Sequence, residues 1–136
     1  MKKQVSPRMI RFIFLLLFCL ALSVGCTAAQ VHKATEEQNG SRITLNVGDS
    51  LQIALAGNPT TGYAWEIAES NPNLLEAQGE VEYQPEKTNL VGSGGTFLFT
   101  FKAIARGNTS LKLVYRRSFE KDMAPIREYQ LTILVE

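Results

Sequence analysis

The sequence predicts an all-β domain, built as an antiparallel β-sandwich. After residue 41, apolar and polar residues alternate along almost every apolar run, which is the period of a half-buried strand. Glycine, proline and asparagine separate these runs, and no run has the spacing of an amphipathic helix. We therefore expect about seven short strands in two packed sheets, an immunoglobulin-like arrangement.

The strands are recognised by their alternating apolar residues. In chain order these are Ile43, Leu45 and Val47; Leu51, Ile53 and Leu55; Tyr63, Trp65 and Ile67; Phe97, Phe99 and Phe101; Leu111, Leu113 and Tyr115; and Tyr129, Leu131, Ile133 and Val135. The run with three phenylalanines alternates most clearly. A weaker strand is expected between Leu74 and Tyr83, with a bulge or break near Gly79.

The first 25 residues have the pattern of an export signal. Four basic residues precede the apolar stretch 12–24, which is long enough for a signal sequence and short for a membrane-spanning helix. Leu22 and Gly25-Cys26 look like a bacterial lipobox, in which the Cys26 thiol would carry a lipid, although Ser23 departs from the usual aliphatic residue. Cleavage by an ordinary signal peptidase after Ala29 is the competing interpretation.

The predicted domains are therefore a signal peptide at 1–25, a flexible tether at 26–40 and the sandwich at 41–136. The tether is predicted because residues 30–40 are polar and lack periodicity. The chain is expected to be exported, either as a membrane-anchored lipoprotein or as a periplasmic or secreted protein. A membrane would be contacted only through the lipid at Cys26.

Charge and cysteine content argue against a nucleic-acid partner and against stabilisation by disulfides or cysteine-bound metal. Removal of residues 1–25 takes away four of 14 basic residues and none of the 13 acidic ones, which leaves a net charge of −3. That balance argues against nucleic-acid binding. The second cysteine, Cys19, leaves with the signal, so hydrophobic burial without disulfide or cysteine-bound metal must hold the domain together. We expect a monomer.

The segment Asn58-Pro59-Thr60-Thr61-Gly62-Tyr63 joins the second and third predicted strands. Pro59 fixes its own φ and pushes Asn58 toward an extended conformation, while Gly62 can adopt a positive φ. The two β-branched threonines have few side-chain rotamers. We expect a stiff, projecting loop that loses little entropy when a partner covers it.

Strand direction predicts where the long connections gather. If every connection reverses the chain across the sandwich, this loop, the segment 84–95 and the segment 116–126 emerge at one end, while short turns occupy the other. Long loops on a rigid scaffold commonly carry recognition. We therefore expect the binding surface at that end.

The two flanking loops offer different contacts. Leu90-Val91-Gly92-Ser93-Gly94-Gly95 combines two apolar side chains with three glycines, so its backbone is open to the main chain of a partner. Arg116-Arg117-Ser118-Phe119 contains cations and a large aromatic ring, residue types enriched at binding hot spots.

The same loops lack the groups that catalysis needs. The only histidine, His32, lies in the predicted tether, so Ser93 and Ser118 have no evident general base. No cluster of histidine, cysteine and carboxylates is present to hold a metal. The sequence predicts a binding protein with no cofactor, not an enzyme.

Three motifs together resemble the chagasin family of cysteine-protease inhibitors. They are the hexapeptide from Asn58 to Tyr63, then Gly92-Ser93-Gly94-Gly95 before a strand, then Tyr115-Arg116-Arg117-Ser118-Phe119, and the similarity runs from about Ile43 to the C-terminus. The family typically has Arg-Pro-Trp where this chain has Arg117-Ser118-Phe119. Loss of the proline is expected to loosen that loop, and Phe in place of Trp to reduce its contact area.

The resemblance implies reversible inhibition of papain-like cysteine peptidases by three loops. The implied protease-binding residues are Asn58, Pro59, Thr60, Thr61, Gly62 and Tyr63; Leu90, Gly92, Ser93, Gly94 and Gly95; and Arg117 and Phe119. The threonine loop would cover the catalytic Cys/His pair without offering a scissile bond in attack geometry. The glycine segment would pair along the non-primed side of the cleft, and the third loop would lie on the primed side.

Other interpretations stay open on the sequence. The chain could be an envelope-anchored immunoglobulin-like adhesion or scaffold module that uses the same loops for another ligand. In a simpler view, Asn58-Pro59 and Gly62 only shape a turn. Tyr63 would then pack in the sandwich, and Phe119 would fold back onto the core.

Overall fold

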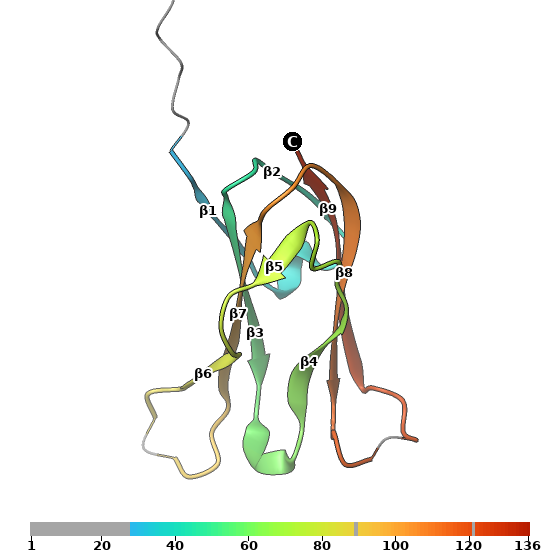
Figure 1. Ribbon diagram of the computed structural model, residues 1–136. Coiled ribbons are helices and arrows are strands. Elements are labelled where there is room, and N and C mark those ends of the chain that lie inside the picture. Colours follow the sequence, from blue (N-terminus) through green and yellow to red (C-terminus); the bar gives the residue numbers. More distant parts are fainter. Residues whose placement is uncertain (1–27, 89, 121) are drawn as a thin grey trace, which may run out of the picture.

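The computed structural model describes residues 28–88, 90–120 and 122–136, which form two β-sheets packed face to face (Figure 1). Cys26 and the predicted export signal lie outside the described residues. The elements are β1 (Val31–Ala34), η1 (Glu36–Gln38), β2 (Arg42–Leu45), β3 (Ser50–Gly57), η2 (Pro59–Thr61), β4 (Ala64–Glu69), β5 (Leu75–Ala77), β6 (Glu82–Pro85), β7 (Gly95–Ala103), β8 (Gly107–Arg116) and β9 (Arg127–Val135). The all-β sandwich is confirmed, with nine strands in the described part of the chain instead of about seven.

The two sheets contain both antiparallel and parallel pairs. One sheet has the order β1-β3-β7-β5, with β6 also paired to β7, and the other has the order β2-β9-β8-β4. The pairs β1–β3 and β2–β9 are parallel, so the prediction of a purely antiparallel sandwich is wrong at these two edges. The alternation of a strand shows which residues face the core, but it holds no information on the direction of the neighbouring strand.

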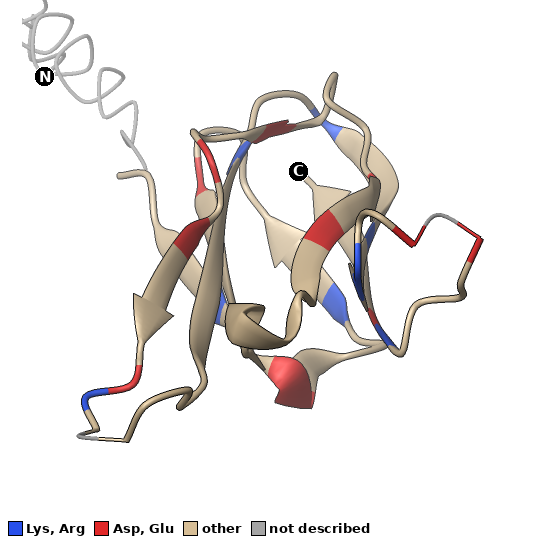
Figure 2. Cartoon of the chain, turned by 90° about the horizontal axis from the view of Figure 1, so that it is seen from below, with Lys and Arg blue, Asp and Glu red and all other residues tan. Residues whose placement is uncertain are grey.

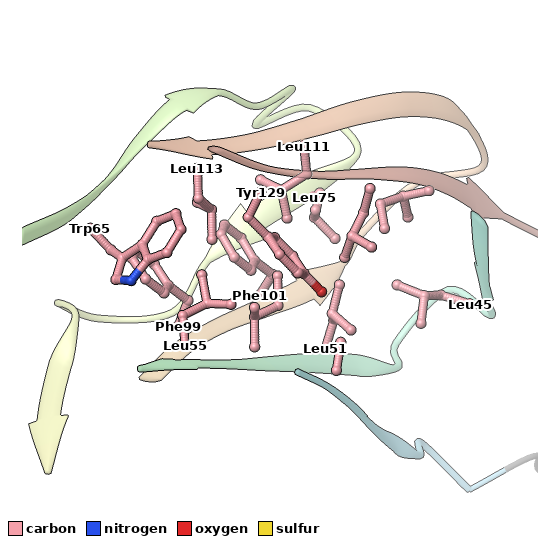
Figure 3. Packing of buried hydrophobic residues seen from close by; sticks show 14 of the residues in the cluster. Leu45, Leu51, Leu55, Trp65, Leu75, Phe99, Phe101, Leu111, Leu113 and Tyr129 are labelled. Atoms are coloured by element: carbon pink, nitrogen blue, oxygen red, sulfur yellow. The ribbon is translucent and has the colours of Figure 1, made fainter. Parts of the chain in front are cut away.

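The core lies between the inner faces of the two sheets (Figure 3). Each predicted alternation in β3, β7, β8 and β9 buries its apolar members, among them Leu55, Phe99, Leu113 and Tyr129. Full burial of such a side chain contributes about 1.5–3 kcal/mol, so these four strands supply most of the hydrophobic stabilisation. Burial also raises the pKa of the Tyr129 hydroxyl to about 12.

The weaker strand predicted between Leu74 and Tyr83 is broken near Gly79, as expected. It forms the short strands β5 and β6, which both pair with β7 and are separated by a segment containing Gly79 at φ 72°. The predicted first strand is shorter than its alternation suggested, because β2 ends at Leu45 and Val47 is 49% exposed.

The prediction of a flexible tether over residues 26–40 is wrong for its second half. Strand β1 runs parallel to β3 and buries Ala34, and η1 follows it directly. One buried residue in a four-residue edge strand gives no periodic signal, which explains why the sequence did not reveal it.

Asp49 holds the start of this N-terminal segment. Its carboxylate accepts hydrogen bonds from the backbone of Gln30 at 2.8 Å and of Asn46 at 2.9 Å, and contacts His32 Nε2 at 3.1 Å. The two backbone hydrogen bonds are the main reason that the pKa of Asp49 is lowered to about 2. His32 therefore has a structural contact rather than a place in a free tether.

Among the residues that the structure describes, no helix is long and apolar enough to cross a membrane.

Candidate functional site

The three long connections meet at one end of the sandwich. Figure 1 shows the β3–β4, β6–β7 and β8–β9 connections at the pole opposite the C-terminus, as strand direction predicted. We call them the central loop (58–63), the glycine loop (86–94) and the C-terminal loop (117–126). The structure thus brings together segments that lie far apart in the sequence.

The central loop is closed by its own hydrogen bonds. Asn58 is extended, at φ −138° and ψ 100°, and its Oδ1 accepts from the Thr60 backbone at 3.1 Å and from the Thr60 hydroxyl at 2.6 Å. The Thr61 hydroxyl donates to the Asn58 carbonyl at 2.6 Å. Gly62, at φ 81°, ends the 3₁₀ turn by donating to the Pro59 carbonyl at 3.0 Å. These hydrogen bonds close the turn, which is the arrangement that a stiff loop requires.

Asn58 also joins the central loop to its surroundings. Its backbone N–H donates to the Tyr115 hydroxyl at 2.8 Å, and its side-chain amide donates to the Gly92 carbonyl at 2.8 Å. The first bond fixes the loop to β8, and the second fixes it to the glycine loop. Asn58 therefore does more than shape a turn.

Arg117 ties the C-terminal loop to the other side of the central loop. Its Nε donates to the Thr61 carbonyl at 3.1 Å, and its guanidinium lies 4.6 Å from the centre of the Tyr63 ring. Tyr63 in turn stacks on Tyr115, with ring centres 5.5 Å apart. Because Tyr63 is half-buried against the core, it supports the loop from below, as the simpler interpretation expected.

Phe119 lies beside the central loop and does not fold back onto the core. Its side chain is 71% exposed, and a Cβ atom added to Gly62 would lie 3.4 Å from its ring. Leu90 is 75% exposed in the glycine loop, and Met123 and Ile126 are exposed in the C-terminal loop. Apolar side chains gathered at one end in this way are typical of a protein-binding surface.

Figure 2 looks onto this end of the molecule. The central loop carries no lysine, arginine, aspartate or glutamate, whereas both flanking loops contain charged residues of each sign. The part that projects in the middle is therefore uncharged and could enter a cleft without burying an ionised side chain.

Ser118 is held by β4. Its hydroxyl donates to Glu66 Oε1, and the other carboxylate oxygen of Glu66 accepts from Arg116 Nε at 3.0 Å. The hydrogen bond from Ser118, followed by the hydrogen bond and charge of Arg116, lowers the pKa of the Glu66 carboxyl. The sequence predicted a looser loop because the family proline is absent, but here a side-chain contact restrains the same position.

The glycine motif has two different structural roles. Gly92 and Ser93 lie at the tip, whereas Gly95 is buried at the start of β7. A side chain at Gly95 would clash with the Gln84 carbonyl, and a Cβ atom at Gly94 would lie 3.2 Å from the Gly57 carbonyl. Gly95 therefore allows β6 and β7 to pair and offers no surface to a partner.

Sequence reasoning missed Glu36, Glu66 and Arg127, which support the loops from below. Glu66 lies diagonally across the β4–β8 pair from Arg116, whose direct partner is Ala64, so an assignment of cross-strand neighbours could have found it. Glu36 and Arg127 lie 91 positions apart and give no comparable signal in the sequence.

The described residues contain no group of three or more histidine, cysteine, aspartate or glutamate side chains placed to hold a metal ion.

Comparison with known proteins identifies the family. The family model described as "Chagasin family peptidase inhibitor I42" matches residues 44–133. The chain is 29% identical over 125 residues to amoebiasin-2 of Entamoeba histolytica, covering 92% of this chain and 98% of that protein. It is 37% identical over 89 residues to chagasin of Trypanosoma cruzi, covering 63% of this chain and 81% of that protein.

A solved structure agrees with these sequence matches. The crystal structure of the cysteine protease inhibitor EhICP2 from Entamoeba histolytica superposes with a TM-score of 0.71 at 27% identity, and covers 80% of this chain and 98% of that one. The matches give no support to an adhesion or scaffold module. This chain therefore belongs to the chagasin family of cysteine-protease inhibitors, and it is an inhibitor, not an enzyme.

Proposed function

We propose that the chain inhibits papain-like cysteine peptidases reversibly, by inserting its three-loop end into the active-site cleft. The observation that carries this proposal is the central loop, which is uncharged and hydrogen-bonded on one side to Gly92 and on the other to Arg117. A loop that is already ordered loses little conformational entropy on binding.

The shape of the central loop explains how it would block the enzyme without being cut. Peptides commonly bind along clefts as extended strands, whereas residues Pro59–Thr61 form a 3₁₀ turn. The bonds of the Thr60 and Thr61 hydroxyls to Asn58 oppose opening of that turn. The loop would therefore cover the catalytic Cys/His pair while keeping its peptide bonds out of attack geometry.

The flanking loops would extend the contact along the cleft. The exposed backbone near Leu90 to Gly94 would pair on the non-primed side, and Phe119 would pack on the primed side, with Arg117 holding the loop beside Thr61. An interface of the standard protease–inhibitor size, roughly 1,600 Å² in total, would permit tight binding by loops that are already ordered.

The proposal extends to location and assembly. Export and acylation of Cys26 are supported by the sequence pattern of residues 1–26. Strand β1 starts at Val31, at the end of the sandwich opposite the loops, so an anchor there would leave the loops facing away from the membrane (Figure 1). A monomer is supported by the short edge strands β1, β2 and β5.

Titration of active papain with the exported protein tests the function directly. We expect inhibition that reverses on dilution, with the inhibitor intact by mass spectrometry after prolonged incubation. Absence of inhibition of papain and of other papain-family enzymes at micromolar concentration would overturn the proposal. The intact mass of the protein isolated from the producing cell would show whether Cys26 is acylated.

A further inference from the structure

The last residues of β3 lead directly into the central loop, and one of their edges has no neighbouring strand. Strand β1 pairs with β3 only as far as Ala34 and Ile53, after which the chain turns away into η1. An unpaired backbone edge would leave the entry to the loop free to move. In this structure, side chains take the place of the missing strand.

Ala56 is the residue on which these side chains converge. Its N–H donates to Glu36 Oε1 at 3.1 Å. Its carbonyl accepts from Trp65 Nε1 at 3.0 Å and from Arg127 Nη1 at 2.9 Å. Both backbone groups of a residue two positions before Asn58 are therefore satisfied by side chains from η1, β4 and β9.

The same contacts continue to the loop itself. Arg127 also donates to Glu36, and its guanidinium lies 5.1 Å from the centre of the Trp65 ring and 5.4 Å from that of Tyr115. The Tyr115 hydroxyl accepts from the Asn58 backbone. Glu36 is itself fixed, because Thr35 and Gln38 close a capping box around η1. A chain of contacts thus runs from the N-terminal segment to the first residue of the loop.

We propose that Glu36 and Arg127 are positioning residues, which hold the end of β3 so that the central loop is presented in its binding conformation. This inference rests on the proposed function. It makes the segment 31–38, which precedes the residues matched by the family model, a working part of the inhibitor. Glu36 and Arg127 contact the loop only through the backbone and rings beneath it.

We expect Glu36 and Arg127 to hold the end of β3 through their hydrogen bonds to Ala56 more than through their attraction for each other. The side chains of Arg127 and Glu36 are 39% and 47% exposed, and ion pairs with that exposure are screened and contribute little. A carboxylate that accepts from a backbone N–H fixes a definite geometry, and preorganisation of this kind increases affinity. An uncharged acceptor at position 36 should therefore retain much of the function.

Four variants test the inference. Glu36→Ala removes the acceptor, Glu36→Gln keeps an acceptor without the charge, and Arg127→Lys keeps the charge without the planar fork. Glu37→Ala is the matched control, because Glu37 is an exposed neighbour in the same turn and its side chain contacts neither Ala56 nor Arg127. The readouts are the inhibition constant for papain, the thermal midpoint, and hydrogen exchange at the Ala56 and Asn58 amides.

We expect Glu36→Ala and Arg127→Lys to raise the inhibition constant about tenfold and to speed exchange at Asn58, whereas Glu36→Gln raises the constant about threefold at most. Glu37→Ala should match the wild type in every readout. If Glu36→Ala lowers the thermal midpoint but changes neither the inhibition constant nor Asn58 exchange, the two residues are structural only and the inference is overturned. If the wild type inhibits neither papain nor any other papain-family enzyme, the proposed function fails, while exchange at Asn58 still tests the positioning role.

Discussion

The side-chain amide of Asn58 donates a hydrogen bond of 2.8 Å to the carbonyl oxygen of Gly92, 34 positions later in the chain. One residue thereby shapes the central loop and joins it to the glycine loop. The two loops consequently form one surface, and a change at Asn58 should affect both.

Asn58→Ala should weaken inhibition more than it weakens the fold. The variant loses the acceptor for Thr60 and the donor to Gly92 together. Loss of such a capping side chain costs about 1 kcal/mol of stability, whereas we expect the inhibition constant for papain to rise about 100-fold. Urea unfolding and inhibition assays measure the two effects. Asn73→Ala, in the β4–β5 connection, is the control, and equal inhibition by both variants would contradict the prediction.

Thr61→Arg should abolish inhibition while leaving the protein folded. Thr61 is exposed at the tip of the central loop, so a long charged side chain there meets solvent in the free protein and the cleft wall in the complex. Exposed substitutions usually change stability by about 0.5 kcal/mol or less. We expect at least a ~100-fold rise in the inhibition constant and only a small fall in the thermal midpoint, which comes from loss of the hydrogen bond between the Thr61 hydroxyl and the Asn58 carbonyl. Thr44→Arg, on the exposed face of β2, should inhibit normally.

Phe119→Ala should lower affinity without lowering stability, because the ring is 71% exposed. Truncation of an aromatic anchor typically costs about 2 kcal/mol or more of binding, which is about a 30-fold rise in the inhibition constant. Phe119→Trp should act in the opposite direction, since the larger indole offers more contact area and a donor. Val47→Ala, at the opposite end, serves as the apolar control. Unchanged inhibition by Phe119→Ala would show that this loop lies outside the interface.

The contacts of Ser118 and Arg116 with Glu66, which hold the C-terminal loop to β4, should weaken in acid. The pKa of Glu66 lies below its ordinary value of 4.5 in the folded protein, first because of Ser118 and then because of Arg116. The ionised carboxylate therefore stabilises the fold fully above pH 4.5, and this contribution is lost as the pH falls through the lower folded-state pKa. Carboxyl NMR titration should give a midpoint below 4.5 for Glu66, moving upward in Ser118→Ala. A midpoint that does not move would contradict the assigned cause.

Asp49→Asn should change acid stability without changing inhibition. The pKa of Asp49 falls from 3.8 to about 2 on folding, so its stabilising contribution is complete above pH 3.8 and is lost as the pH falls toward 2. The variant should be less stable at neutral pH and should lose stability less steeply between pH 4 and about pH 2. Thermal unfolding across this range measures the slope. The inhibition constant should stay at the wild-type value at neutral pH, because Asp49 lies at the end opposite the loops and the pairing of β1 with β3 still holds the N-terminal segment.

The sequence was sufficient wherever the signal is local. The alternation in β7 predicts which side chains the sheet buries, because successive residues of a strand must face opposite sides. Pro59 and Gly62 predict a closed turn, and this signal is also local. Proline fixes its own φ, and glycine permits a positive φ at its own position. Reversal of direction at each connection then placed the three loops at one end, which the structure confirms.

Pairs of residues that meet across the fold were decided only by the tertiary structure. The contact of Glu36 with Arg127 spans 91 positions and that of Ser118 with Glu66 spans 52. The parallel pairing of β1 with β3 also depends on where a neighbouring strand lies. The alternation of apolar and polar residues shows only which face of the sheet each residue lies on. The partner it meets depends on the packing of the whole chain, so a local pattern cannot contain it.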